Sequence, residues 1–113
     1  MALYHHEVYI PTNIKLPTGA YSLTYSQHAR QAARSDRYGH IPLPAYIDTS
    51  KAMLIEVEIE NGKILKILYR SQLNDKLDVC IVVIPGRWFV KTLWINESSD
   101  KHFTLNRNKY ATR

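Results

Sequence analysis

The segment from Val90 to Tyr110 places cations and proton carriers at close spacing. It begins with an alternation of side chains that indicates a strand, and Lys91 and Thr92 lie in the middle of that strand. After a polar loop come three more side chains that donate or accept protons or hydrogen bonds: His102, Thr104 and Tyr110. The segment is interpreted either as an edge strand with a solvated tail or as one wall of a cleft for an anionic substrate.

This set of side chains suits cleavage of RNA without a metal ion. In that reaction the 2′-hydroxyl attacks the neighbouring phosphorus, a base takes its proton, an acid protonates the leaving oxygen, and cations stabilise the transition state. His28 and His102 are the candidate base and acid, and Arg70 and Lys91 are the candidate ligands of the phosphoryl oxygens. Two aromatic side chains are candidates for stacking on a nucleobase: Tyr110 and Trp94.

The position of the Lys-Thr pair sets a geometric condition. Successive side chains of a regular strand point to opposite faces, so Lys91 and Thr92 line one cleft only at a bulge or at a strand end. The same alternation puts Lys66, Leu68 and Arg70 on one side of their strand. The candidate nucleic-acid contacts outside the catalytic set are Arg30, Arg34, Arg37, Trp94, Thr104 and Arg107.

Composition is that of an ordinary globular protein, with 45% hydrophobic and 22% charged residues in a chain of 113. The length predicts a single domain, 1–113, and the net charge of +5 favours a polyanionic partner only weakly, because it is also a usual solubility charge.

No apolar run could span a bilayer and no signal peptide is evident, so no membrane association is expected. The single cysteine, Cys80, lies in an apolar run, which predicts a buried structural thiol and a reducing, cytoplasmic location.

Common cofactor motifs are absent from the sequence. It contains no GxxxxGK[ST], GxGxxG, CxxC or HExxH, so neither a nucleotide cofactor nor a metal site is expected. Glu56, Glu58 and Glu60 alternate along a strand and indicate a solvated face, not a pair of carboxylates for glycoside hydrolysis.

One helix is predicted over residues 26–38, with Ser26 as N-cap and Gly39 as the residue that ends it. Its arginines would form a basic stripe that either faces solvent or pairs with the strand glutamates. In the first turn the helix dipole disfavours an imidazolium at His28, so that residue is either a base or a hydrogen-bonded structural histidine.

Four strands separated by short turns are predicted between residues 52 and 96. The turns are Asn61-Gly62, a strong type I′ hairpin signal, Asn74-Asp75-Lys76, and Pro85-Gly86. They predict an antiparallel meander with the helix packed on it, an α+β domain. Residues 1–25 are expected to be extended, with a hairpin over 21–25 against the sheet edge, residues 40–50 to be a connector, and 97–113 a tail.

Three segments resemble a known group of ribonucleases: YSQHARQAARSDRYG, YRSQLNDKLDVCIVV and VKTLWINESSDKHFTLNRNKY. The chain from about Tyr25 to Tyr110 is similar to small phage and bacterial proteins of the RelE/colicin D type, within the wider barnase–EndoU–colicin–RelE ribonuclease-like group. The resemblance implies a helix on a curved four-stranded antiparallel sheet and RNA cleavage without a metal. It would assign functional roles to His28, Arg70, Lys91, Thr92, His102, Thr104 and Tyr110.

Other functions remain open from the sequence. The alternative is a non-catalytic phage-type protein that binds nucleic acid or inhibits a host protein, and a third reading is an accessory subunit that oligomerises through an exposed strand. Expected partners are RNA if the protein is active, or a protein such as an antitoxin or host target. A monomer or small oligomer is expected.

Overall fold

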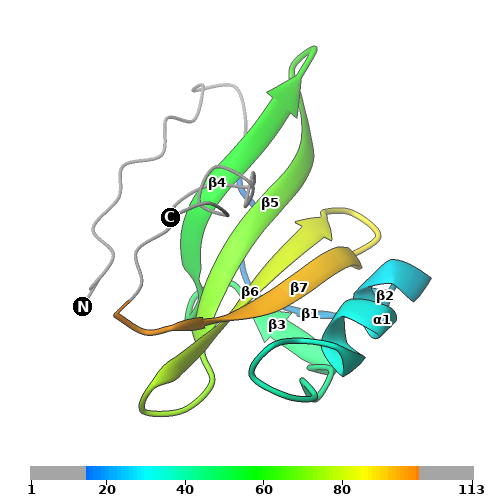
Figure 1. The fold of residues 1–113 in the computed structure, drawn as a ribbon. Coiled ribbons are helices and arrows are strands. Elements are labelled where there is room, and N and C mark those ends of the chain that lie inside the picture. Colours follow the sequence, from blue (N-terminus) through cyan, green and yellow to red (C-terminus); the bar gives the residue numbers. More distant parts are fainter. Residues whose placement is uncertain (1–14, 100–113) are drawn as a thin grey trace.

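A computed structural model describes residues 15–99 of the chain. The described part is α+β, with one helix, a five-stranded sheet and a separate two-stranded sheet (Figure 1). Strand order in the large sheet is β2-β7-β6-β5-β4. These strands are β2 (Thr24–Tyr25), β4 (Met53–Glu60), β5 (Lys63–Gln72), β6 (Leu77–Ile84) and β7 (Phe89–Glu97).

The predicted meander is confirmed for β4 to β7, which pair antiparallel in sequential order. Between β4 and β5 the chain reverses at Asn61 and Gly62, whose φ angles are 54° and 76°. Both angles are positive, as a type I′ turn requires, and asparagine and glycine tolerate this conformation best. The local turn chemistry therefore fixes the strand order in this part of the sheet.

The sheet has a fifth strand that the sequence did not predict. The two-residue strand β2 pairs in parallel with β7, with Thr24 opposite Phe89 and Tyr25 opposite Val90. Prediction of four strands was wrong because so short a strand has no periodicity to detect. Backbone hydrogen bonds from Thr24 N to Trp88 O (3.1 Å) and from Ser26 N to Val90 O (3.0 Å) hold it there.

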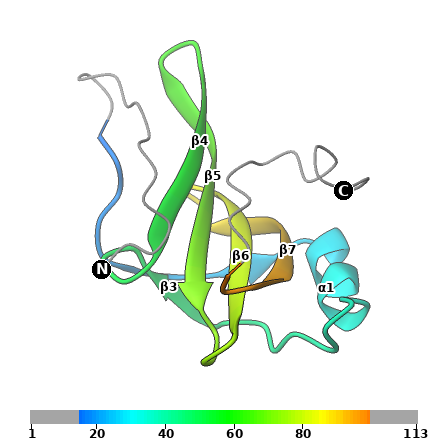
Figure 2. The same cartoon turned by 60° about the vertical axis from the view of Figure 1, so that its left-hand side comes forward.

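The predicted hairpin over residues 21–25 does not form. Strand β1 (Ala20–Ser22) instead pairs antiparallel with β3 (Tyr46–Asp48), which lies in the expected connector. Figure 2 shows this small sheet beside the base of the large one. The two halves of the 20–25 segment therefore belong to different sheets.

The helix α1 (Gln27–Arg34) begins where predicted and ends early. The Ser26 side chain accepts a hydrogen bond from Ala29 N at 2.9 Å, which confirms the N-cap. The expected end at Tyr38 and Gly39 is wrong: Ser35 is the C-cap. Asp36 then turns the chain, because its carboxylate accepts hydrogen bonds from Tyr38 N (3.0 Å) and from Ile95 N of β7 (3.2 Å).

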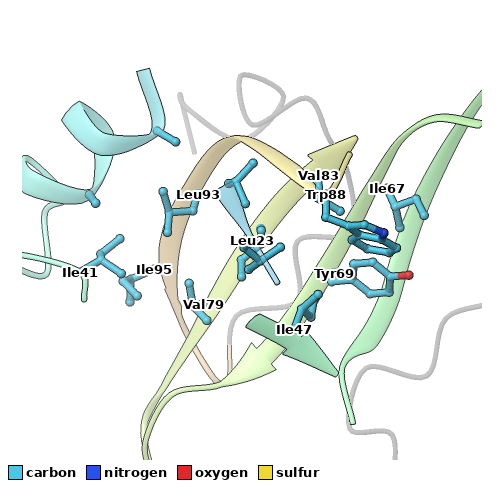
Figure 3. Close-up of a cluster of buried hydrophobic side chains, with 14 residues drawn as sticks. Leu23, Ile41, Ile47, Ile67, Tyr69, Val79, Val83, Trp88, Leu93 and Ile95 are labelled. Carbon is cyan, nitrogen blue, oxygen red and sulfur yellow. The ribbon is translucent and has the colours of Figure 1, made fainter. Parts of the chain in front are cut away.

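Buried hydrophobic residues form a cluster on each face of the large sheet. The helix face carries the larger cluster, in which Ala29 and Ala33 of α1 pack with side chains of the sheet and of β3 (Figure 3). The opposite face, here called the lysine face because it carries Lys66 and Lys91, holds the smaller cluster: Ile55, Leu68, Cys80, Val82 and Trp94. Burial of Cys80 at 2% exposure confirms that expectation.

Candidate functional site

A small pocket lies where the first turn of α1 meets the lysine face. It has a volume of about 190 Å³ and is lined by His28, Lys66, Val82, Lys91 and Thr92. His28, Lys91 and Thr92 were candidate site residues from the sequence. The structure therefore brings together three of the predicted side chains, which come from the helix and from β7.

A β-bulge explains how Lys91 and Thr92 reach the same pocket. In the pairing of β6 with β7, Val82 is opposite Thr92 and Val83 is opposite Val90, so Lys91 is an extra residue without an opposing partner. An inserted residue interrupts the alternation of side chains. Lys91 is exposed and Thr92 is half-buried. The bulge that the sequence required for a shared cleft is present at this position.

The N-cap serine connects the helix to this bulge. The Ser26 hydroxyl donates to the Lys91 carbonyl oxygen at 2.9 Å, and the hydroxyl oxygen of Ser26 accepts from Ala29 N at 2.9 Å. Ser26 N also donates to Val90 O at 3.0 Å. A bulge leaves backbone groups outside the regular ladder, and here a side chain satisfies one of them. This serine thereby fixes His28, two residues later, beside Lys91.

Lys66 is a member of the pocket that sequence reasoning did not assign. It lies on β5, and its ammonium group is 3.2 Å from a carboxylate oxygen of Glu58 on β4. The two side chains are 35% and 45% exposed, so this is a surface pair of small energetic weight. Its signal in the sequence was the alternation that placed Lys66 on the same side of the strand as Arg70.

Arg70 does not line the pocket. Its Nε donates to Asp78 Oδ2 at 2.8 Å and its Nη2 donates to Glu97 O at 2.8 Å. Side chains of this ion pair are 1% and 5% exposed. Arg70 is four residues along β5 from Lys66, a separation of roughly 13 Å at the rise of a strand. Its place in the structure is a buried ion pair at the other end of the lysine face.

The remaining nucleic-acid candidates are dispersed. Trp94 is 4% exposed within the smaller cluster, so its ring is a core side chain with no face open for a nucleobase. The arginine stripe is interrupted because α1 ends at Arg34 and Arg37 lies beyond it. The Arg30 guanidinium lies 6.0 Å from the Tyr25 ring and that of Arg37 lies 4.9 Å from the Tyr38 ring.

Four predicted site residues fall outside the described range: His102, Thr104, Arg107 and Tyr110. The pairing of His102 with His28 as acid and base therefore stays a prediction, as do the roles of the other three residues.

Burial affects two tyrosines on the helix face. Burial raises the pKa of Tyr25 to about 12 although the nearby Arg30 lowers it, and the Tyr25 hydroxyl donates to Pro44 O. Burial, with a smaller effect of Tyr21, raises the pKa of Tyr69 to about 12. The raised pKa values keep both phenols protonated over a wider range of pH than a solvent-exposed tyrosine.

A larger cavity, of about 570 Å³, lies at the opposite end of the sheet, between the β5–β6 loop and the end of β7. Its charged lining residues are Asp75, Lys76 and Glu97. Two of these three residues are acidic, so this cavity suits a phosphate group less well than the pocket of His28, Lys66 and Lys91 does. The smaller pocket is therefore the better chemical candidate.

Comparisons of the chain with protein-family models, with curated proteins and with solved structures found no match. Between residues 15 and 99, no group of three or more histidine, cysteine, aspartate or glutamate side chains could hold a metal ion. Within the same residues, no helix has the length and apolar character needed to cross a membrane.

Proposed function

We propose that the protein is a ribonuclease-like enzyme that cleaves RNA by attack of the 2′-hydroxyl, with the scissile phosphate bound in the pocket of Lys91. One observation carries the proposal: the bulge at Lys91 brings Lys91 and Thr92 to the same pocket as His28 and Lys66. Two ammonium groups, a hydroxyl and an imidazole are the kinds of side chain that phosphate binding and proton transfer require.

Each side chain has a definite role in this reaction. Lys91 and Lys66 bind the phosphoryl oxygens and stabilise the charge that develops on them, and the Thr92 hydroxyl donates a further hydrogen bond. His28 takes the proton of the 2′-hydroxyl as the hydroxyl oxygen bonds to phosphorus. The bond from phosphorus to the 5′-oxygen breaks, and that oxygen takes a proton from a general acid. We give this role to His102, the candidate acid from the sequence, which lies outside the described residues.

The direct test is incubation of the pure protein with RNA in the presence of EDTA. Cleavage that persists in EDTA, leaves a 2′,3′-cyclic phosphate, and is lost in both Lys91→Ala and His28→Gln supports the proposal. Lys76→Ala is the matched control, because Lys76 is an exposed lysine at the opposite end of the sheet. No cleavage by the native protein, or equal cleavage by Lys91→Ala, contradicts it.

A second candidate is a non-catalytic protein that binds RNA at the same pocket, of the kind some phages make. The observation that favours it is the burial of Arg70 in an ion pair with Asp78. Arg70 was an expected ligand of the phosphate. Because it is buried in the ion pair, fewer cations are left to stabilise the transition state. If this second candidate is right, the native protein binds RNA, Lys91→Ala binds it more weakly, and neither protein cleaves it.

A further inference from the structure

An arginine and a phenylalanine form a cation–π contact at the start of β7. The Arg87 guanidinium carbon lies 4.7 Å from the centre of the Phe89 ring. Arg87 is exposed and Phe89 is half-buried, so the guanidinium is the outer member of the pair. A guanidinium held over an aromatic ring is oriented before any ligand arrives, which reduces the entropy lost on binding.

The pairing of β7 puts Phe89 on the same face as the pocket. Phe89 is opposite Ile84, and the next residue, Val90, is opposite Val83. Val83 and Val90 belong to the cluster of the helix face. Since side chains alternate, Phe89 lies on the lysine face, two residues before the bulge at Lys91.

Trp88, between Arg87 and Phe89, has an unusual backbone conformation. Trp88 has a φ of 54°, which is rare and costly for a bulky residue, and its indole is buried on the helix face, stacked on Tyr21 at 4.0 Å between ring centres. Figure 3 shows Trp88 among the buried side chains of that face. The indole of Trp88 is therefore in the core of the helix face, while Phe89, the next residue, lies on the opposite face and contacts Arg87.

We propose that Arg87 and Phe89 form a nucleobase-stacking subsite for single-stranded RNA, next to the phosphate pocket; this inference rests on the proposed function. The base stacks on the outward plane of the Arg87 guanidinium, and Phe89 holds that plane in place. Phe89 and Lys91 are separated by two residues of strand, roughly 7 Å. That spacing fits the base and the phosphate of one nucleotide or of two adjacent ones.

The occupant is a single strand because stacking of this kind needs an unpaired base. In duplex RNA each base is already stacked on its neighbours, and proteins contact the duplex through its backbone and minor groove. Stacking is tolerant of sequence, since every base has a flat face. The subsite therefore predicts affinity that depends on the presence of bases and only weakly on their identity.

The test compares two ligands of equal length and charge: a 2′-O-methyl oligouridine, which cannot be cleaved by 2′-hydroxyl attack, and an abasic oligomer with the same backbone. The native protein should bind the oligouridine about tenfold more tightly, within the range expected for stacking of a base. Arg87→Lys keeps the charge and removes the planar group, so it should abolish this preference and leave binding of the abasic oligomer unchanged. Phe89→Leu should have the same effect.

The control variants separate this inference from the proposed function. Lys91→Ala should weaken binding of both ligands by the same factor and keep the tenfold preference. If the native protein binds both ligands equally, and more tightly than Lys91→Ala does, the stacking subsite is refuted and the phosphate pocket stands. A preference that survives both Arg87→Lys and Phe89→Leu also refutes it. If the native protein binds neither ligand, the proposed function falls, and the subsite falls with it. Because Arg87 is exposed, the Arg87→Lys variant should fold normally, and a change in its binding can be attributed to the lost guanidinium.

Discussion

Each end of the lysine face carries a basic side chain, but the two side chains differ in burial and in their partners. At one end Arg70 is buried, and hydrogen bonds to Asp78 and to Glu97 O satisfy two of its nitrogens. At the other end Lys91 is exposed on a bulge, at the rim of a pocket that also contains a histidine, a threonine and a second lysine. The comparison shows that the neighbours of a cation on a strand, and not its charge, decide whether it is buried in an ion pair or left exposed.

The two basic side chains should also differ in how much they contribute to the stability of the fold. Removing one partner of a buried ion pair leaves an uncompensated charge away from water, which costs several kcal/mol. Loss of an exposed lysine costs almost nothing in stability. The two ends should therefore respond to substitution in opposite ways: variants at the Arg70 end should change stability, and variants at the Lys91 end should change ligand binding.

The largest effect is expected for Asp78→Ala. This change leaves Arg70 buried without its carboxylate and should lower the free energy of unfolding by about 3–5 kcal/mol. Urea denaturation followed by circular dichroism measures this directly. The double variant Arg70→Met with Asp78→Leu removes both charges and should recover most of the loss. If the double variant is as unstable as Asp78→Ala, the unpaired charge of Arg70 is not the cause of the lost stability.

RNA binding by that double variant sharpens the comparison further. Because Arg70 lies outside the pocket, the refolded double variant should bind single-stranded RNA within about twofold of the native protein, a difference close to the usual independence of distant sites. A large loss of affinity in a well-folded double variant would show that Arg70 contacts the RNA.

Ser26→Ala should have an intermediate effect on both properties. The change removes an N-cap and the hydrogen bond to Lys91 O, and it should cost about 1–2 kcal/mol of stability. It should also weaken RNA binding, because the helix no longer holds the bulge beside His28. Ser26→Thr is the control that keeps the hydroxyl. Full affinity in a destabilised Ser26→Ala protein would show that the pocket does not depend on this contact.

The smallest change in stability is expected for Lys91→Ala. The side chain is exposed, so the free energy of unfolding should stay within about 0.5 kcal/mol of the native value. Thermal or urea unfolding checks it. A loss above 1 kcal/mol, on the scale of a substitution in the core, would mean that Lys91 is part of the scaffold, as Arg70 is.

Local sequence signals were sufficient for the parts of the fold that short-range chemistry decides. Asn61-Gly62 determines a type I′ hairpin and Ser26 caps the helix, and both are confirmed. Burial of Cys80 follows from its apolar strand. The two-residue strand β2 and the small sheet of β1 and β3 were missed, because two or three residues carry no periodicity. Their pairing is decided by contacts with residues distant in sequence.

The site was predictable in part for the same reason. Alternation showed that Lys91 and Thr92 need a bulge, but no local feature of the sequence gives the position of one. The pairing of Arg70 did leave a signal: Asp78 lies in an apolar central strand, and a buried carboxylate requires a partner. That signal was available and should have directed Arg70 to a structural role. The contact between Arg87 and Phe89 left no signal in the sequence, because no local pattern predicts the positive φ of Trp88 between them.

The most direct test of the difference between the two ends is the salt dependence of RNA binding in two lysine variants. Lys91 and Lys76 are both exposed, one at the pocket and the other at the opposite end of the sheet. Each phosphate contact with a single strand contributes about −0.7 to the slope of log affinity against log salt. Lys91→Ala should flatten the slope by about 0.7 and weaken binding of all sequences alike, while Lys76→Ala should leave the slope unchanged. Equal slopes in the two variants, or a change in Lys76→Ala alone, would contradict the assignment of the pocket as the phosphate site.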